Sequence, residues 1–459
     1  MILKYNFANW GKIMSSARKL ALKAIYRINE EGAFSNLILN ELLNNSDLDQ
    51  RDKSLVTQLV YGSIRHRNSL DWVINHFSNR KVKKMTPWVR NALRLGVYQI
   101  DHLDKIPAPV AANETVEVAK EYCNRGAVKF INGNLRNIAQ NIASVEYPDK
   151  EKDPVQYIRY RYSYPQWIVQ RWVKRYGREK TIEICQHLNE IPPTVIRTNT
   201  LKVTRSQLLS DLEKEGAEAE EITRVKEAVD LINYDSISSL DSFQQGKFIV
   251  QGLSSMLVAH VLEPTADDLV VDLCAAPGGK STHFAQLMNN QGQINAVDLY
   301  QQKLDLIQEN CDRLGIENIE TYCGDGREIN FDQQADKILV DAPCSGLGII
   351  GKKPEIRWQK KPQDLKQLQE LQLELLTNAA GLLSSGGELV YSTCTFTPEE
   401  NQSVIEQFLD QFPEFSIVDL EAEAKKYQLT DYLDNGMLKI LPDNNFLEGF
   451  FITKLVKTS

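Results

Sequence analysis

The chain of 459 residues predicts a composite fold, in which an all-helical domain precedes an α/β domain with a mostly parallel sheet. Three observations predict it. Hydrophobic residues recur at helical spacing up to residue 142, apolar strands alternate with helical stretches from about residue 241, and a proline-bearing stretch lies between these regions. A chain of this length is too long for one hydrophobic core, and we expect two to four domains.

The helical domain is predicted over residues 15–145. Apolar residues recur there every three or four positions, as Leu20, Ala24 and Ile28 do. Asp49 lies where the positive end of a helix dipole favours negative charge, just before another helical stretch. Because no strand-like alternation interrupts the region, the pattern predicts a compact all-α domain.

Residues 146–240 are predicted to hold a linker and a small α+β connector. Pro148, Pro154 and Pro165 lie among charged residues in the stretch 143–165, a composition typical of a linker. The elements expected beyond it are a helix over 166–188, a strand over 192–197 and a helix over 206–215.

Residues 241–459 are predicted to form the α/β domain. Five apolar strands alternate here with helical stretches, which is typical of a mostly parallel sheet with helices on both faces. The predicted strands are residues 269–271, 293–297, 319–322, 337–340 and 388–391.

Composition narrows the class of protein. A net charge of −8 excludes a histone-like polycation, although local basic patches still permit binding to nucleic acid. Seven cysteines without a C-x-x-C pair predict reduced thiols and no metal site, as in a cytoplasmic protein. Residues 1–16 contain no apolar signal-peptide core and no apolar run is long enough to span a bilayer, so we expect neither secretion nor membrane insertion.

A glycine-bearing turn joins the first strand of the α/β domain to a helix. Residues 270–281 read VVDLCAAPGGKS, and Gly278 and Gly279 allow a ligand to approach the backbone. Asp298 ends the next strand, where an acidic residue binds ribose hydroxyls in a nucleotide-like site, and Asp325 follows the third strand. The turn lacks the G-x-G-x-x-G and Walker spacings, so a nucleotide-like cofactor other than a dinucleotide or ATP is predicted.

Two cysteine-bearing segments follow strands of the same predicted sheet. Residues 341–346 read DAPCSG and include Cys344, and residues 391–395 read YSTCT and include Cys394. Two thiols at the ends of neighbouring strands indicate covalent chemistry, with one thiol to attack and another to help release. A cytosine ring requires such help, because its carbon-5 is a poor nucleophile until a group adds to carbon-6.

These motifs resemble two known families. Residues 51–72, with RDKSLV, YGSIR and LDW, resemble the NusB family of helical RNA-binding domains. Residues 190–457, from GKFIVQ at 246–251 to EGFF at 448–451, are similar to the RNA cytosine carbon-5 methyltransferases. Those enzymes use S-adenosylmethionine on a Rossmann-like sheet, and the resemblance implies the same cofactor and fold here.

The resemblance implies roles for particular residues. Cys394 is implied as the nucleophile that adds to carbon-6, and Cys344 as the residue that assists product release. This order favours RNA over DNA, because the DNA enzymes attack with the cysteine of the Pro-Cys pair. Asp341 is expected at the N3/N4 edge of cytosine, with Lys280 orienting Asp341 or the base. The implied cofactor contacts are Cys274, Ala275, Ala276, Pro277, Gly278, Gly279, Lys280, Asp298, Asp325 and Asp341.

The implied substrate is one cytosine of bacterial 16S ribosomal RNA, methylated by a monomeric enzyme. The base must be unpaired or flipped, because a thiol does not reach carbon-6 inside a stacked helix. Two residues depart from the family's pattern: Gly252 replaces an acidic residue and Glu448 replaces a more usual Asp. Neither change removes a catalytic group, so we expect them to alter local packing.

Three basic segments are candidates for contact with RNA. Residues 159–180 combine Arg and Lys with Tyr and Trp, which suits single-stranded RNA, and a buried helix explains them equally well. The cluster between Arg80 and Arg94 is either a phosphate site or a solvated helix face. Residues 351–358, GKKPEIRW, follow the Cys344 segment and are the favoured candidate.

Alternative functions stay open at this point. The same chemistry acting on another RNA, such as tRNA, fits every motif. A ribosome assembly factor that retains the fold without catalysis is disfavoured by the pair of Cys344 and Cys394. A methyltransferase of exocyclic amines needs no attacking thiol, and the chain lacks the Asn/Asp-Pro-Pro-Tyr motif expected there.

Overall fold

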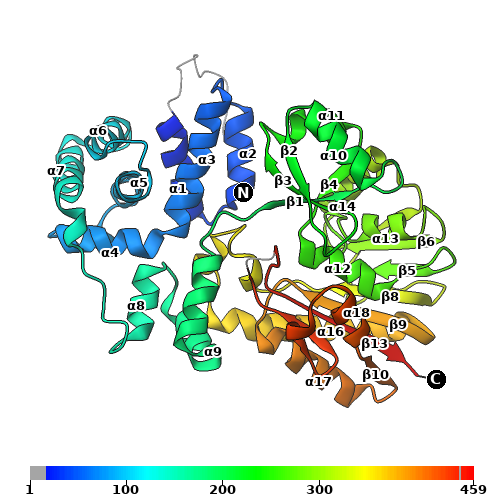
Figure 1. The fold of residues 1–459 in the computed structure, drawn as a ribbon. Helices are drawn as coiled ribbons and strands as arrows, with labels where there is room; N and C mark the ends of the chain where they lie inside the picture. Colours follow the sequence, from blue (N-terminus) through cyan, green and yellow to red (C-terminus); the bar gives the residue numbers. More distant parts are fainter. Residues whose placement is uncertain (1–16, 444–445, 459) are drawn as a thin grey trace, which may run out of the picture. The chain divides into compact units, whose positions relative to one another are not determined.

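The computed structural model describes residues 17–443 and 446–458, which fall into two compact units (Figure 1). The first unit comprises Met1–Asn189 and Lys353–Gln359, and the second comprises Glu190–Lys352 and Lys360–Ser459. The start of the predicted helical domain and the segment considered for a signal peptide lie outside the described residues. Among the residues that are described, no helix has the length and apolar character needed to cross a membrane.

The first unit is helical throughout its described residues, which confirms the all-α prediction. Asp49 caps one helix by accepting a hydrogen bond from the Asp52 amide (2.8 Å), and aliphatic residues such as Leu22, Leu59 and Leu135 form the core. The helices are α1 (Ala17–Glu31), α2 (Ser35–Asn44), α3 (Gln50–Arg65), α4 (Arg67–Phe77), α5 (Pro87–His102), α6 (Ala108–Ala119), α7 (Arg125–Asn141), α8 (Pro154–Arg161), α9 (Gln166–His187) and α15 (Ile356–Gln359).

The prediction of a linker over residues 143–165 was wrong for the part that forms α8. Asp153 accepts a hydrogen bond from the Gln156 amide, and Pro154 occupies the first helical turn. Proline has no amide proton to lose at that position and its fixed φ suits a helix, so it begins a helix here instead of interrupting one. The predicted helix over 166–188 is confirmed as α9, although it bends at Gly177, where φ is 78°.

The second unit contains a small antiparallel sheet in the order β2-β3-β1-β4 (Figure 1). It confirms the predicted α+β fold of the connector. The boundary at residue 240 stays a prediction, and the last of the four strands lies beyond it. The elements are β1 (Thr194–Thr198), α10 (Arg205–Lys214), β2 (Glu218–Glu221), β3 (Ala228–Asn233), α11 (Asp241–Gln244) and β4 (Phe248–Val250).

The larger sheet of the second unit confirms the predicted α/β fold. Five parallel strands lie in the order β9-β8-β5-β6-β7. They are β5 (Leu269–Asp272), β6 (Gln293–Asp298), β7 (Ile319–Cys323), β8 (Ala335–Asp341) and β9 (Leu383–Thr393). Alternate strand residues face opposite cores: Val270 and Leu339 pack in the core that includes the helices within residues 253–314, and Val340 packs in the core that includes the helices within residues 362–411.

An antiparallel extension of this sheet was not predicted. The last strand of the chain, over residues 450–457, pairs antiparallel to β9, and the short strands over residues 415–418 and 437–440 pair antiparallel to that last strand. The strand over residues 433–434 pairs with the strand over residues 437–440. These are β10 (Phe415–Val418), β11 (Leu433–Asp434), β12 (Met437–Ile440) and β13 (Phe450–Lys457). The helices of this region are α12 (Leu253–Leu262), α13 (Ser281–Leu287), α14 (Gln301–Leu314), α16 (Pro362–Leu382), α17 (Gln402–Gln411) and α18 (Glu421–Lys426).

Candidate active site

The turn between β5 and α13 lies at the carboxyl edge of the parallel strands. Asp272 ends β5 and accepts a hydrogen bond from Ser281 Oγ (2.7 Å), which ties the two ends of the turn together. Gly278 has a φ of 92°, a conformation that other residues rarely adopt. A Cβ atom on Gly279 would meet no atom closer than 3.9 Å. The backbone of this turn is therefore open to a ligand.

Two carboxylates occupy the same edge beyond the turn. Asp298, at the end of β6, accepts a hydrogen bond from the Tyr300 amide (3.2 Å) and lies 3.4 Å from Lys303 Nζ. Asp325 follows β7 and pairs with Arg327 (2.6 Å), whose guanidinium lowers the pKa of Asp325. Carboxylates at successive strand ends next to an open glycine turn fit the hydroxyl and amino groups of a nucleoside cofactor.

Asp272, which ends β5 just before this turn, has an unusual environment for a carboxyl group. Its Oδ1 atom is buried and has no hydrogen-bond partner among the described residues. Burial raises the pKa of Asp272 to about 7, and the nearby Asp341 carboxylate acts in the same direction.

Cys344 and Cys394 meet at this edge because the strands that precede them are neighbours. β8 and β9 pair in parallel with Asp341 beside Ser392, so the following loops begin side by side. The two Sγ atoms lie 3.2 Å apart, and both residues are half-buried. The hydrogen bond between the thiols is the main cause that raises the pKa of Cys344, and burial adds to it. This keeps a proton on Cys344.

Lys280 connects the cofactor turn to the cysteine strands. Its Nζ atom contacts Asp341 Oδ2 at 2.5 Å, and Ser392 Oγ donates to Asp341 Oδ1 at 2.7 Å. Burial alone would lower the pKa of Lys280, but the Asp341 carboxylate raises it, with smaller contributions from Asp272 and Cys394. Lys280 therefore stays a cation between the turn and the thiols. Its role in orienting Asp341 or the base stays a prediction.

Glu400 ties together the loops that follow both cysteines, and the sequence interpretation missed it. Its carboxylate accepts hydrogen bonds from the Ser345 amide and hydroxyl, both at 2.6 Å, and Ser345 Oγ lies 3.1 Å from Thr395 Oγ1. Gln372 in α16 donates to the Pro343 carbonyl (2.9 Å). Burial raises the pKa of Glu400. The one available signal was an acidic residue shortly after Cys394 in the sequence.

The favoured RNA segment has another role in part. Residues 353–359 belong to the first unit, and Arg357 is fully buried there. Trp358 Nε1 donates to the Ile64 carbonyl (2.7 Å). The prediction of RNA contact was therefore wrong for Arg357, because its guanidinium binds protein carbonyl groups. Lys353 is exposed, and its contact with RNA stays a prediction.

Each of the other two basic segments contains both buried and exposed side chains. In residues 159–180, Tyr164 and Trp172 are buried with ring centroids 5.5 Å apart, whereas Lys174 and Arg175 are exposed. In the cluster between Arg80 and Arg94, the last arginine is buried and pairs with Asp71, whereas the lysines at 81, 83 and 84 are exposed. Only the exposed cations remain available to phosphates.

The two departures from the family pattern lie against each other. A Cβ atom on Gly252 would lie 1.9 Å from Glu448 Oε1. Gly252 precedes α12 without a side-chain cap, and Glu448 Oε2 accepts a hydrogen bond from the Ser254 amide (3.1 Å) at the start of that helix. Glu448 also pairs with Lys352. The longer acid therefore caps the helix from a distant position, in space that only glycine leaves open.

The fold and this edge define a class of protein, the Rossmann-like methyltransferases that use S-adenosylmethionine. A family model described as 16S rRNA methyltransferase RsmB/F matches residues 259–456, one for the NusB family matches residues 15–140, and one for an RsmF/B-like ferredoxin-like domain matches residues 164–237. The chain belongs to the RsmB/F family of 16S rRNA methyltransferases. S-adenosylmethionine is its cofactor.

Relatives cover nearly the whole chain. A Bacillus subtilis protein named probable ribosomal RNA small subunit methyltransferase B is 40% identical over 96% of this chain and 99% of its own length. The crystal structure of PH0851 superposes with a TM-score of 0.81 and 28% identity, covering 97% of this chain and all of that one. The structure of NSun6 from Pyrococcus horikoshii with SFG has a TM-score of 0.57 and 26% identity, and covers 63% of this chain and 97% of that one.

Proposed function

We propose that this chain methylates carbon-5 of a cytosine in 16S ribosomal RNA, at position 967, through a transient bond between Cys394 Sγ and carbon-6 of the base. The observation that carries the proposal is the 3.2 Å separation of the Cys344 and Cys394 sulfur atoms on the edge that also holds Lys280 and Asp341. The names of the relatives support 16S ribosomal RNA as the substrate. The NusB-like domain, over residues 15–145, is proposed to bind RNA around an unpaired or flipped base.

Cys394 supplies the attacking thiolate. A thiol must lose its proton before it attacks, and Lys280 lies on the same sheet edge as Cys394, bound to the Asp341 carboxylate. Addition of this sulfur to carbon-6 moves an electron pair of the ring to carbon-5, which becomes nucleophilic. S-adenosylmethionine, when bound, supplies the methyl group that carbon-5 takes. Each Asp341 oxygen already accepts one hydrogen bond, from Lys280 or Ser392, and has a lone pair left for the cytosine amino group.

Cys344 acts after methyl transfer. Once Cys394 is bonded to carbon-6 its sulfur carries no charge, so the main cause of the raised pKa of Cys344 is gone. Cys344 then releases its own proton to solvent and takes the proton from carbon-5. The electron pair of that C–H bond restores the ring double bond and expels Cys394 as thiolate. Both sulfurs end as they began, and the base has gained one methyl group.

The proposed roles are tested by two variants incubated with a 16S ribosomal RNA fragment and S-adenosylmethionine. Cys344→Ser should accumulate a heat-stable protein–RNA adduct, seen as a retarded band on a denaturing gel. Cys394→Ala should give neither adduct nor methylated RNA while binding S-adenosylmethionine as the unchanged chain does. Full methylation by Cys394→Ala would refute the covalent mechanism.

The choice of RNA is tested separately. A tRNA pool is the matched competitor, and bisulfite sequencing of 16S ribosomal RNA from a strain that lacks this chain locates the missing methyl group. Loss of methylation only on tRNA would contradict the proposed substrate and leave the cysteine chemistry intact. A chain that binds ribosomal RNA and leaves its methylation unchanged would support the assembly-factor alternative.

A further inference from the structure

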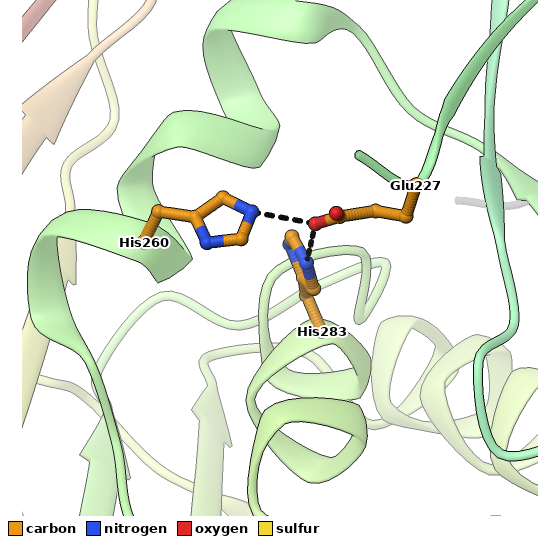
Figure 2. Close-up of side chains that lie close together, drawn as sticks. All are labelled: Glu227, His260 and His283. Carbon is orange, nitrogen blue, oxygen red and sulfur yellow. Dashed lines mark hydrogen bonds and ion pairs between the residues drawn. The ribbon is translucent and has the colours of Figure 1, made fainter. Parts of the chain in front are cut away.

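A buried polar cluster in the second unit joins the connector to the helices beside the cofactor turn. Glu227 lies just before β3, His260 belongs to α12 and His283 belongs to α13, and all three are buried. Figure 2 shows both imidazole rings pointing at one carboxylate. Glu227 Oε1 accepts hydrogen bonds from His260 Nε2 (2.5 Å) and His283 Nε2 (2.8 Å). Wide separation along the chain explains why no sequence motif marks this cluster.

The cluster has the residue types of a zinc site but the spacing of hydrogen bonds. Two ligand atoms on one tetrahedral zinc lie about 3.3 Å apart, because each is about 2.0–2.1 Å from the metal. Both distances to Glu227 Oε1 are shorter than that. Arg197 is also fully buried in this interior. Its positive charge acts on His283 and would repel a divalent cation bound there. The group is therefore best described as a carboxylate that accepts hydrogen bonds from two imidazole rings.

Arg197 reaches from the connector to the cofactor turn. Its guanidinium donates to the Gly279 carbonyl (2.6 Å) and to Thr282 Oγ1 (3.0 Å), and it also contacts Gln251 Oε1. Gly279 belongs to the open turn, and Thr282 lies in the first turn of α13. One connector side chain thus fixes both sides of the point where the turn becomes a helix.

Glu227 supplies the charge that balances this arginine. β1 and β3 place Arg197 beside Ala228, and the Thr198 amide donates to the Glu227 carbonyl (2.8 Å). Burial lowers the pKa of Arg197, and the Glu227 carboxylate opposes that shift. Burial alone would raise the pKa of Glu227, but the hydrogen bonds from His260 and His283 lower it, which keeps the carboxylate charged.

We infer that Arg197 is a positioning residue for S-adenosylmethionine, and that Glu227, held by His260 and His283, is its buried counter-charge. The connector sheet is then part of the cofactor site, because it sets the conformation of the Gly279 carbonyl and of the helix start beside it. Rigid preorganisation of the turn lowers the cost of binding a ligand there. This inference depends on the cofactor and not on the identity of the target base.

Isothermal titration of S-adenosylmethionine without RNA tests the inference. Arg197→Met should raise the dissociation constant about tenfold or more, since a charged donor to the turn is lost. Arg197→Lys keeps the cation but not the fork of donors and should give an intermediate value. Glu227→Gln leaves Arg197 in place without its counter-charge and should raise the constant about threefold, which provides a second route if Arg197→Met does not fold. In turnover, Arg197→Lys should raise KM for S-adenosylmethionine and leave KM for RNA unchanged.

Arg205→Met is the matched control. Arg205 lies on the same connector, pairs with Glu221 and contacts the carbonyls of Ile222 and Val225. If its removal weakens S-adenosylmethionine binding as much as Arg197→Met, the connector acts through general stability and the inference fails. The inference also fails if zinc, titrated into chelator-treated chain, binds stoichiometrically and strengthens cofactor binding, or if Arg197→Met binds the cofactor normally.

Discussion

Each unit buries one arginine completely, and the two arginines are held in different ways. Arg197 and Arg357 are both 0% exposed. Arg197 has a carboxylate in its surroundings and donates to one backbone carbonyl in the cofactor turn. Arg357 contacts no carboxylate among the described residues of the first unit, and its guanidinium lies 4.2 Å from the centre of the Tyr164 ring.

The difference separates a residue that positions a ligand site from one that holds segments together. Arg357 donates to the carbonyls of Arg65 (3.3 Å) and Ser163 (3.2 Å) and to Asn189 Oδ1 (2.9 Å), so it connects several helices to residues 353–359. Backbone dipoles and an aromatic face compensate its charge. Removing Arg357 should therefore cost mainly stability, whereas removing Arg197 should cost mainly cofactor affinity.

The largest expected effect is that of Arg357→Met. The apolar side chain leaves several buried acceptors without donors, so the first unit should lose about 3–5 kcal/mol of unfolding free energy. All the tryptophans among the described residues belong to the first unit, at positions 72, 88, 167, 172 and 358, so tryptophan fluorescence in urea reports that unit. Arg197→Met is the matched control and should leave the tryptophan transition near its original midpoint. Equal shifts in both variants would remove the distinction between the two arginines.

The features of the fold and of the site that could be predicted from the sequence are those that depend on local patterns. Helical spacing, strand alternation and a glycine turn are short-range features, and the structure confirms the all-α domain, the α+β connector and the parallel strands. The segments of Cys344 and Cys394 carried enough pattern to be singled out, and the strand register explains why their sulfurs meet.

The missed features depend on contacts between distant positions. Arg357 lies in a basic segment whose composition predicts contact with RNA. Only the folded structure shows that Arg357 is buried against Tyr164. Arg197 lies in a predicted strand where nothing local shows that it reaches Gly279. Residues 143–165 were assigned to a linker because proline marks helix starts and breaks alike, and only the Asp153 cap decides between them.

A second prediction concerns the acid sensitivity of the Arg197 surroundings. Burial, together with Arg197, lowers the pKa of His283 from 6.5 to about 3. Between these values the unfolded chain binds a proton on this residue and the folded chain does not, so the contribution of His283 to the stability of the second unit should fall as pH falls from 6.5. Asp272, whose pKa is raised to about 7, contributes the opposite slope, so the effect of His283 is measured as the difference between His283→Gln and the unchanged chain. The slope for one such group approaches about 1.4 kcal/mol per pH unit.

His283→Gln keeps a donor toward Glu227 without a titrating ring and should remove that part of the slope. Hydrogen exchange of the parallel strands, measured between pH 6.5 and 5, follows the second unit. In this window Glu227 contributes little, because its pKa is lowered from an ordinary value already below pH 5. An unchanged slope in His283→Gln would show that His283 is protonated in the folded chain, and the balance of charge around Arg197 would need another explanation.

A third, smaller effect is expected at Gly252 and Glu448. Gly252→Ala places a methyl group where Glu448 Oε1 lies, so the capping carboxylate must leave Ser254 and Lys352, at about 1–2 kcal/mol. Adding Glu448→Asp shortens the acid and should recover part of the loss. A double-mutant cycle on the second unit measures this coupling. Additive costs would mean that the two departures from the family pattern are independent.

The smallest effect is expected at Glu355, which lies on the same segment as Arg357. Glu355 accepts hydrogen bonds from the Ser35 amide (3.0 Å) and hydroxyl (2.9 Å), and it replaces the side-chain cap that Phe34 does not provide at the start of α2. Glu355→Gln retains one acceptor oxygen but loses the charge that favours a helix N-terminus. The unfolding free energy of the first unit, measured by tryptophan fluorescence, should therefore fall by about 1 kcal/mol. Ser35→Ala removes the hydroxyl bond alone and should cost less. If Glu355→Gln destabilised the first unit as strongly as Arg357→Met, residues 353–359 would dock through the cap as much as through the arginine, and the contrast between the two buried arginines would lose its energetic basis.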